Sequence, residues 1–227
     1  MRMRRKPNLK ARMERCAHLL IAEPGLLRGR WLCLAEDRSR GGDLLPALGI
    51  DELGRGGLHV ELGCGKGRFT VETAKAEAGV FIVALEKTAD VMIIALERAA
   101  AESLKNVRFV NAFADDLLDY FAPGEVSRIY LNFCDPWPSN RHVKRRLTHR
   151  RFLNLYSQVL KPGGEIHFKT DNLPLFEYSL QEFELAGFTL NEVTRDLHQD
   201  GPVGVMTDYE QKFHGQGQPI CRCVARK

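Results

Sequence analysis

The sequence lacks any long apolar run. None of its 227 residues lies in a stretch approaching about 18 consecutive apolar side chains, the length that a membrane-spanning helix needs. The N-terminus is basic but has no apolar core behind it, so it does not resemble a secretion signal. We therefore expect a cytoplasmic protein with no membrane partner.

Paired cysteines of the metal-binding kind are also missing. None of the six cysteines forms a Cys-x-x-Cys pair, and Cys221 and Cys223 are spaced like two residues on the same face of a strand. We expect reduced, mostly buried thiols and no metal site. Internal repeats and low-complexity segments are absent too, which excludes a repeat architecture.

Acidic residues are absent from residues 141–151, which carry six Lys or Arg. Residues 1–15 carry seven Lys or Arg against one Glu, so the rest of the chain is acidic, although the total net charge is only +4. Two basic patches on an acidic body fit the binding of nucleic acid phosphate. Two solvated faces are the alternative interpretation of the charge pattern.

The length and the hydrophobic content of 44% suit one α/β domain and exclude a disordered chain. We expect residues 1–57 to form a basic N-terminal arm with an irregular lead-in. From residue 58 onward, strand-like runs alternate with helix-like segments, which predicts a doubly wound, mainly parallel sheet with helices on both faces. The predicted domain covers residues 58–227, with a Gly- and Gln-rich loop over the site at residues 195–219. The seven expected strands are 58–62, 80–85, 107–110, 126–131, 165–170, 189–193 and 220–225.

The stretch from Asn132 to Pro138 is the centre of the predicted site. A buried strand precedes it, and the sequence Pro136-Trp137-Pro138 ends that strand. Asp135 is thereby left at the carboxyl end of a strand, where open α/β sheets bind their ligands. The cations that follow suggest a polyanionic substrate that presents a group becoming positive.

A glycine-rich turn, residues 63–67, lies between the first strand and its helix. Lys66 is followed by Gly67 and not by Ser or Thr, so the turn is not a nucleotide-binding P-loop. The third glycine comes one position too early for a dinucleotide fingerprint. S-adenosylmethionine, which carries no phosphate, remains as the expected ligand of Gly63 and Gly65.

Two acidic residues accompany this turn. Glu61 precedes Gly63 by two positions and can face the amino acid end of the cofactor. Glu86 ends the second strand, where a carboxylate can accept hydrogen bonds from both ribose hydroxyls. A tight turn with a chance acid is the alternative.

Other polar residues close the remaining strands. Residues 111–115 follow the third strand and suit an adenine site, although Asn111 alone also fits a helix cap. Asp171 follows the fifth strand and is either a substrate contact or the N-cap before Pro174. His142 fits an RNA contact or a solvated residue better than a base.

Together these motifs resemble one family over nearly the whole chain, from Met1 to about Cys223. The chain is similar to the bacterial tRNA (guanine-N7)-methyltransferases, which are class I, Rossmann-like enzymes. The motifs that carry the resemblance are Arg2 to Pro7, Glu61 to Gly67, Asn132 to Pro138 followed by Arg141-His142 and Lys144 to His149, Lys161 to Gly164, Phe168 to Asn172, and Thr207 to Glu210. The Asp-Pro-Trp-Pro motif with its basic continuation is highly specific.

The resemblance implies roles for individual residues. Asp135 matches the catalytic aspartate, which also contacts the cofactor. The implied cofactor contacts are Glu61, Gly63, Gly65, Glu86, Asn111, Ala112 and Phe113. The implied substrate contacts are Ser139, Arg141, His142, Lys144, Arg145, Asp171, Thr207, Asp208, Tyr209 and Glu210.

Three positions depart from the family pattern. Phe113 stands where the family often has Asp, so a side-chain hydrogen bond to adenine is in question. Ser139 replaces a usual Lys, and Asp208 stands where Glu is common.

The expected function is methyl transfer from S-adenosylmethionine to N7 of a guanine in tRNA, by resemblance the guanine in the variable loop. The expected partner is tRNA, and the expected state is a monomer or a homodimer. A methyltransferase of a protein or small molecule is one alternative, which the two basic patches disfavour. A non-catalytic RNA-binding protein on the same fold is the other, which Glu61, Glu86 and Asp135 disfavour.

Overall fold

The computed structural model describes residues 6–32 and 56–227. The first five residues of the predicted basic arm and Cys33 lie outside the described residues. In the part described, no helix is long and apolar enough to cross a membrane.

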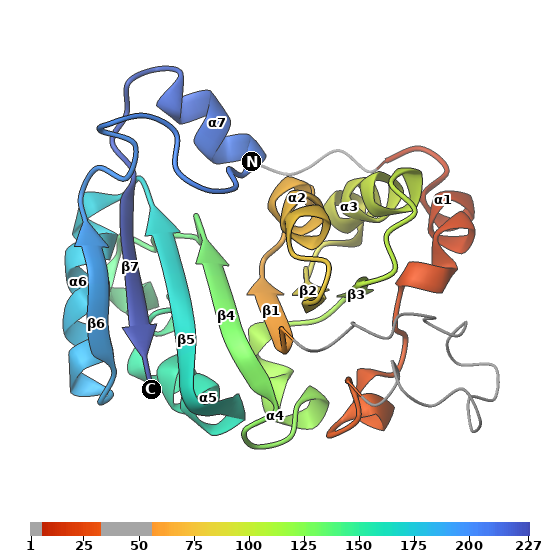
Figure 1. Cartoon of the computed structure of the whole chain (residues 1–227), viewed down its shortest axis with the longest axis horizontal. Coiled ribbons are helices and arrows are strands. Elements are labelled where there is room, and N and C mark those ends of the chain that lie inside the picture. The colour runs from red at the N-terminus through yellow and green to blue at the C-terminus, as the bar shows by residue number, and fades with distance from the viewer. Residues whose placement is uncertain (1–5, 33–55) are drawn as a thin grey trace.

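A seven-stranded sheet forms the centre of the molecule, in the order β3-β2-β1-β4-β5-β7-β6 (Figure 1). Strands β1 to β5 pair in parallel, and β7 is antiparallel to both of its neighbours, β5 and β6. The predicted mainly parallel, doubly wound sheet is confirmed. The strands are β1 (Leu58–Leu62), β2 (Phe81–Leu85), β3 (Val107–Val110), β4 (Val126–Asn132), β5 (Leu160–Thr170), β6 (Thr189–Thr194) and β7 (Cys221–Arg226).

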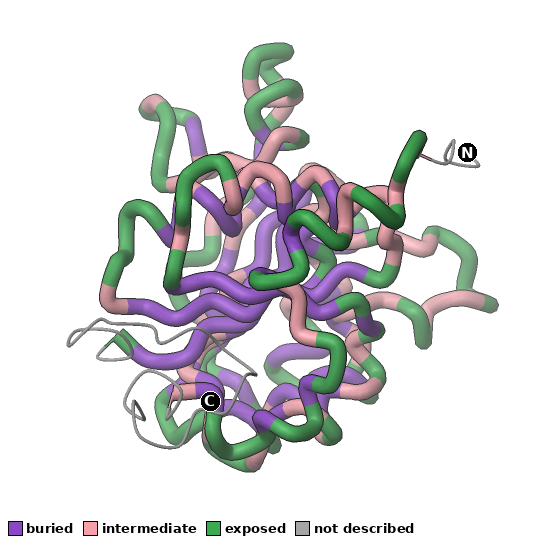
Figure 2. Tube along the Cα trace, turned by 90° about the vertical axis from the view of Figure 1, so that its right-hand side faces the viewer, coloured by how far each residue is buried: buried purple, intermediate pink, exposed green. Residues whose placement is uncertain are grey.

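Helices pack on both faces of this sheet, because alternate residues of the strands point to opposite sides. In β2, Phe81 and Val83 belong to one apolar core, and Ile82 and Ala84 belong to the other. Figure 2 shows buried residues concentrated along the strands at the middle of the molecule. The helices are α1 (Leu9–Arg15), α2 (Arg68–Ala76), α3 (Ala89–Ala101), α4 (Leu117–Tyr120), α5 (Arg150–Val159), α6 (Leu173–Leu185) and α7 (Asp208–His214).

Of the predicted N-terminal arm and lead-in, residues 6–32 contain α1 and the 3-10 helices Ala17–Leu19 and Pro24–Leu27. Helix α1 lies against α3, where Arg12 donates two hydrogen bonds to the Glu97 carboxylate at 2.7 and 2.6 Å. Trp31 is completely buried and stacks on Phe121 with ring centroids 5.4 Å apart. Residues 6–32 therefore cover the domain and contribute to its cores.

Two element predictions are wrong in part. The fifth strand was expected to begin at residue 165, but residues 161–164 also lie within β5, where Val126 pairs with Leu160 and Arg128 pairs with Glu165. The extra residues are accommodated as an irregularity in the register, with Gly163 at φ 72°. The expected loop of residues 195–219 contains helix α7, which begins with a capping box between Thr207 and Glu210.

One face of the central strands carries a buried polar cluster. Burial lowers the pKa of His59 on β1 to about 3, and its ring lies 3.1 Å from the Tyr130 hydroxyl on β4. Burial also lowers the pKa of His167 on β5 to about 4, so both imidazoles are neutral at pH 7. Toward the carboxyl ends of the strands, the same face continues into Glu61, Asn132 and Lys169.

Candidate active site

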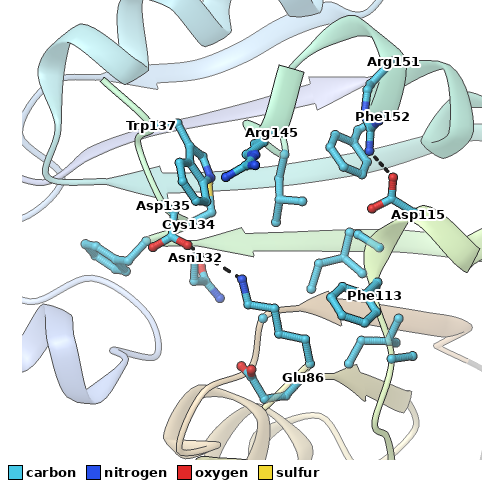
Figure 3. A pocket seen from close by; sticks show the side chains of 18 residues that line it. Glu86, Phe113, Asp115, Asn132, Cys134, Asp135, Trp137, Arg145, Arg151 and Phe152 are labelled. Carbon is cyan, nitrogen blue, oxygen red and sulfur yellow. Dashed lines mark hydrogen bonds and ion pairs between the residues drawn. The ribbon is translucent and has the colours of Figure 1, made fainter. Parts of the chain in front are cut away.

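A cavity of about 610 Å³ lies at the carboxyl ends of β1, β2, β3 and β4 (Figure 3). Parallel strands bring their carboxyl ends to one edge, so residues far apart in the sequence share this cavity. Of the predicted site residues, it is lined by Gly63, Glu86, Ala112, Phe113, Asp135 and Arg145.

A second cavity, of about 410 Å³, adjoins the first and shares Gly63, Asn132 and Phe133 with it. Of the predicted site residues, it is lined by Glu61, Gly63, Gly65, Thr207, Asp208 and Tyr209. The predicted residues that line neither cavity are Asn111, Ser139, Arg141, His142, Lys144, Asp171 and Glu210.

The glycine turn joins β1 to α2 and lines the second cavity. At Gly67, with φ 76°, an added Cβ would lie 2.4 Å from the Ala95 Cβ, so only glycine lets α2 approach α3. At Gly63 and Gly65, the space that a Cβ would occupy has no atom within 4 Å. The turn therefore leaves room beside its backbone for a ligand.

Glu86 is fixed by backbone donors. Its carboxylate accepts hydrogen bonds from the Gly65 N–H at 3.2 Å and the Thr88 N–H at 2.9 Å, and the residue is 8% exposed. The Asn111 side-chain amide donates to the Glu86 carbonyl at 2.7 Å. Asn111 makes no side-chain cap with the following helical turns, so the capping alternative is wrong for it.

Phe113 is 58% exposed and lines the larger cavity without any polar side-chain atom. Asp115, which also belongs to the predicted adenine region of residues 111–115, is ion-paired with Arg151. At this wall of the larger cavity, the chain therefore presents the aromatic ring of Phe113.

Asp135 lies in the turn after β4, and its side chain is 69% exposed. The Lys87 ammonium lies 3.9 Å from this carboxylate and lines the same cavity. Sequence reasoning missed Lys87, although its position directly after Glu86 was a usable signal. Beside Asp135, burial raises the pKa of the Cys134 thiol to about 12, so this cysteine is not a thiolate nucleophile at neutral pH.

Glu61 is nearly completely buried on the floor of the second cavity. Its carboxylate accepts hydrogen bonds from the Thr70 hydroxyl and from the Asn132 amide, the latter at 3.1 Å. Burial raises the pKa of Glu61, while these two hydrogen bonds act in the opposite direction. The carboxylate is therefore held in one orientation below the glycine turn.

The predicted substrate motif on α7 divides into two parts. Thr207 caps the helix, Asp208 is ion-paired with Arg98, and Tyr209 donates to the Asp171 carboxylate at 3.0 Å. Glu210 is completely buried, and both of its oxygens accept from Lys169, at 3.0 and 2.8 Å.

A substrate contact by the Glu210 side chain is therefore wrong for this structure, because no part of it reaches the surface. The role of N-cap that was considered for Asp171 belongs instead to Asn172, whose side chain accepts from the Leu175 N–H.

The basic run after Asp135 is less free than its charge suggests. Arg150 donates to both carboxylate oxygens of Glu182, and Arg151 is paired with Asp115. Arg145 lies over the Trp137 ring at 4.9 Å. Arg141 and Lys144 are exposed on the 3-10 helix Asn140–Arg145, beside His142 and after its N-cap, Ser139.

In the described residues, no group of three or more His, Cys, Asp or Glu side chains is arranged to hold a metal ion. The five described cysteines are free, and four of them are buried.

Solved structures share this fold. One is a 16S rRNA methyltransferase, with a TM-score of 0.57 at 17% identity, covering 75% of this chain and 87% of that chain. Another, from Aquifex aeolicus, is described as a SAM dependent methyltransferase, with a TM-score of 0.53 at 17% identity, covering 77% of this chain and 84% of that chain. At these identities the likeness shows the fold alone.

Residues 55–223 match the family described as "Putative methyltransferase", which defines the class of this chain as methyltransferases. The fold, the glycine turn and the acid directly after β2 agree with this class. A curated relative from Geobacillus kaustophilus, "tRNA (guanine-N(7)-)-methyltransferase", is 45% identical over 99% of this chain and 96% of its own length. A second relative with this name, from Geobacillus thermodenitrificans, is 44% identical over 99% and 97%. The chain belongs to the tRNA (guanine-N(7)-)-methyltransferase family.

The position of Glu86 leads to a first prediction. We expect Glu86→Ala to weaken S-adenosylmethionine binding by roughly 1.5–3 kcal/mol, the scale of hydrogen bonds to a charged group. Calorimetric titration measures this affinity. Glu97→Ala, which removes a carboxylate on the outer side of α3, is the control. An affinity unchanged by Glu86→Ala would rule out a cofactor contact by this carboxylate.

Proposed function

We propose that this protein transfers a methyl group from S-adenosylmethionine to N7 of a guanine in tRNA. By resemblance, this is the guanine in the variable loop. The observation that carries the proposal is the position of Asp135 in the larger cavity, with Glu86 and the glycine turn beside it and cations at its rim. The names of the curated relatives support the choice of substrate.

The two adjoining cavities fit the cofactor. The open space beside Gly63 and Gly65, the fixed carboxylates of Glu61 and Glu86 and the aromatic face of Phe113 suit the amino acid, ribose and adenine parts. S-adenosylmethionine supplies an electrophilic methyl group on a positively charged sulfur. The chain must hold this group in line with its acceptor, which lowers the entropic part of the barrier.

Guanine N7 has a free lone pair and no proton at neutral pH, so its methylation requires no general base. Asp135 accepts hydrogen bonds from the N–H edge of guanine, which orients the base. As the purine becomes positive, the negative carboxylate stabilises it more than it stabilises the neutral ground state. The Lys87 ammonium lies 3.9 Å from the Asp135 carboxylate, so guanine must displace it to bind this carboxylate.

Tandem mass spectrometry of nucleosides tests the proposal directly. tRNA lacking 7-methylguanosine is incubated with the protein and labelled cofactor, digested, and analysed for the labelled nucleoside. Label in protein and none in RNA would contradict the proposal. Binding of tRNA without any methyl transfer would favour the non-catalytic alternative.

The exposed cations at the rim lead to a second prediction. We expect the tRNA affinity to fall steeply with salt, and Arg141→Met with Lys144→Met to reduce the slope by about two phosphate contacts. Cofactor affinity, measured alongside, should change little with salt.

Arg150→Met is the matched control, because Arg150 is already bound to Glu182. A slope that stays at the wild-type value in the double variant would mean that Arg141 and Lys144 do not contact phosphate. The basic N-terminal residues belong to the same proposal, and deletion of residues 1–12 should also reduce the slope.

A further inference from the structure

Arg146 differs from its basic neighbours in what it contacts. Its Nε donates to the Pro136 carbonyl at 2.9 Å, and its terminal nitrogen donates to the Trp137 carbonyl at 3.1 Å. The central carbon of its guanidinium, Cζ, lies over the Tyr178 ring on α6, 4.4 Å from the ring centre. The Arg146 side chain thus connects the turn after Asp135 to α6.

The backbone of that turn offers few hydrogen-bond donors of its own. Pro136 and Pro138 have no backbone N–H with which to form a hydrogen bond. Trp137 has φ 41°, a left-handed conformation that is unfavourable for a bulky residue and persists only where the surroundings enforce it. The two hydrogen bonds from Arg146 fall on the carbonyls of this strained segment.

The turn also forms one wall of the larger cavity. Figure 3 shows Asp135, Trp137 and Arg145 together on this wall. Arg145 and His142 contact the Trp137 indole, with centre distances of 4.9 and 5.7 Å. Arg146 therefore fixes the backbone of the turn, and its two neighbours contact the side chain that the turn presents.

We infer that Arg146 is a positioning residue, which sets the conformation of the Pro136-Trp137 backbone and through it the placement of Asp135 and Trp137 in the cavity. The link to methyl transfer rests on the function proposed above. A planar guanidinium suits this task, because its fork of donors reaches two carbonyls while its face packs on an aromatic ring. A lysine has the same charge but neither the fork nor the flat face.

The alternative to a positioning role is that Arg146 contacts RNA phosphate, as expected for a cation in a basic run. Its geometry disfavours this, because two of its nitrogens already donate to carbonyls and its face is packed on Tyr178. Arg146 is half-buried, whereas Arg141 and Lys144 are exposed.

The test compares Arg146→Lys and Arg146→Met with Arg150→Met. Arg150 belongs to the same run and also binds α6, through Glu182, but does not touch the turn. Three readouts are measured in each protein: the saturated single-turnover rate, the tRNA affinity, and acrylamide quenching of tryptophan fluorescence. The chain has two tryptophans, and Trp31 is completely buried, so quenching reports mainly on Trp137.

We expect both Arg146 variants to lose at least tenfold in the saturated rate, to keep tRNA affinity within about threefold, and to show stronger quenching of Trp137. Arg150→Met should match the wild type in rate and in quenching. A wild-type rate in Arg146→Lys, with weaker tRNA binding only in Arg146→Met, would identify a phosphate contact and overturn the inference.

Unchanged quenching in both Arg146 variants would also overturn it. The quenching experiment needs no substrate, so it still decides the role of Arg146 if methyl transfer to tRNA itself is not found.

Discussion

We expect Asp135→Asn to lower the saturated single-turnover rate of methyl transfer by about 100-fold or more, with tRNA affinity nearly unchanged. The substitution keeps the size of the side chain but removes the negative charge that faces the developing purine cation. It also turns one acceptor oxygen into a donor, which opposes the N–H edge of guanine. Removing one such electrostatic contact from an active site typically costs about 10²–10³ in rate.

The measurement uses excess enzyme, so that the rate reports one turnover. Asp116→Asn removes the same charge from a nearby 3-10 turn outside the cavities and should stay close to the wild-type rate. In the wild type, the rate should be flat between about pH 6.5 and 8.5, because N7 loses no proton. A tenfold rise per pH unit would reveal a base that this mechanism lacks.

The second large effect is on stability. We expect Lys169→Met to lower the free energy of unfolding by about 3–5 kcal/mol, because it leaves a buried carboxylate without its cation. Glu210 is completely buried, and Lys169 donates to both of its oxygens and to the Val205 carbonyl at 3.0 Å. Burial lowers the pKa of Lys169, while the Glu210 charge acts in the opposite direction.

Denaturant unfolding measures this change, and the double variant Lys169→Met with Glu210→Gln is the control. It removes both charges, so it should be clearly more stable than the single variant. If Lys169→Met costs less than about 1 kcal/mol, the pair contributes little and α7 is held by its other contacts. Cofactor affinity should fall with stability, because α7 presents Thr207, Asp208 and Tyr209 to the second cavity.

Much of the site could be predicted from the positions where the strands end. The apolar runs before Gly63, before Glu86 and before the Asn132–Pro138 stretch identified β1, β2 and β4, and parallel pairing brings their ends to one cavity. These predictions rest on local sequence and one topological rule, which is why they needed no knowledge of side-chain contacts.

The rest depended on contacts between distant residues. In the sequence, the six cations of the basic run are equivalent. In the structure, Arg146 donates to backbone carbonyls, Arg150 pairs with Glu182, and Arg151 pairs with Asp115. No pattern within the run distinguishes them from Arg141. The capping box of α7 was different, since a Thr followed three residues later by Glu is a local signal, here obscured by the surrounding Gly and Gln.

The place of β7 in the sheet has a consequence for the order of folding during synthesis. In the part of the chain that the structure describes, β6 is hydrogen-bonded to β7 alone, although β6 precedes β7 in the sequence. Residues 189–194 therefore leave the ribosome before any partner strand exists for them. The edge of β5 likewise has no pairing partner until residues 221–226 are synthesised and form β7 between β5 and β6. Over that interval β5 and β6 both lack the strand that later pairs with them, so the nascent chain exposes unpaired backbone that favours aggregation.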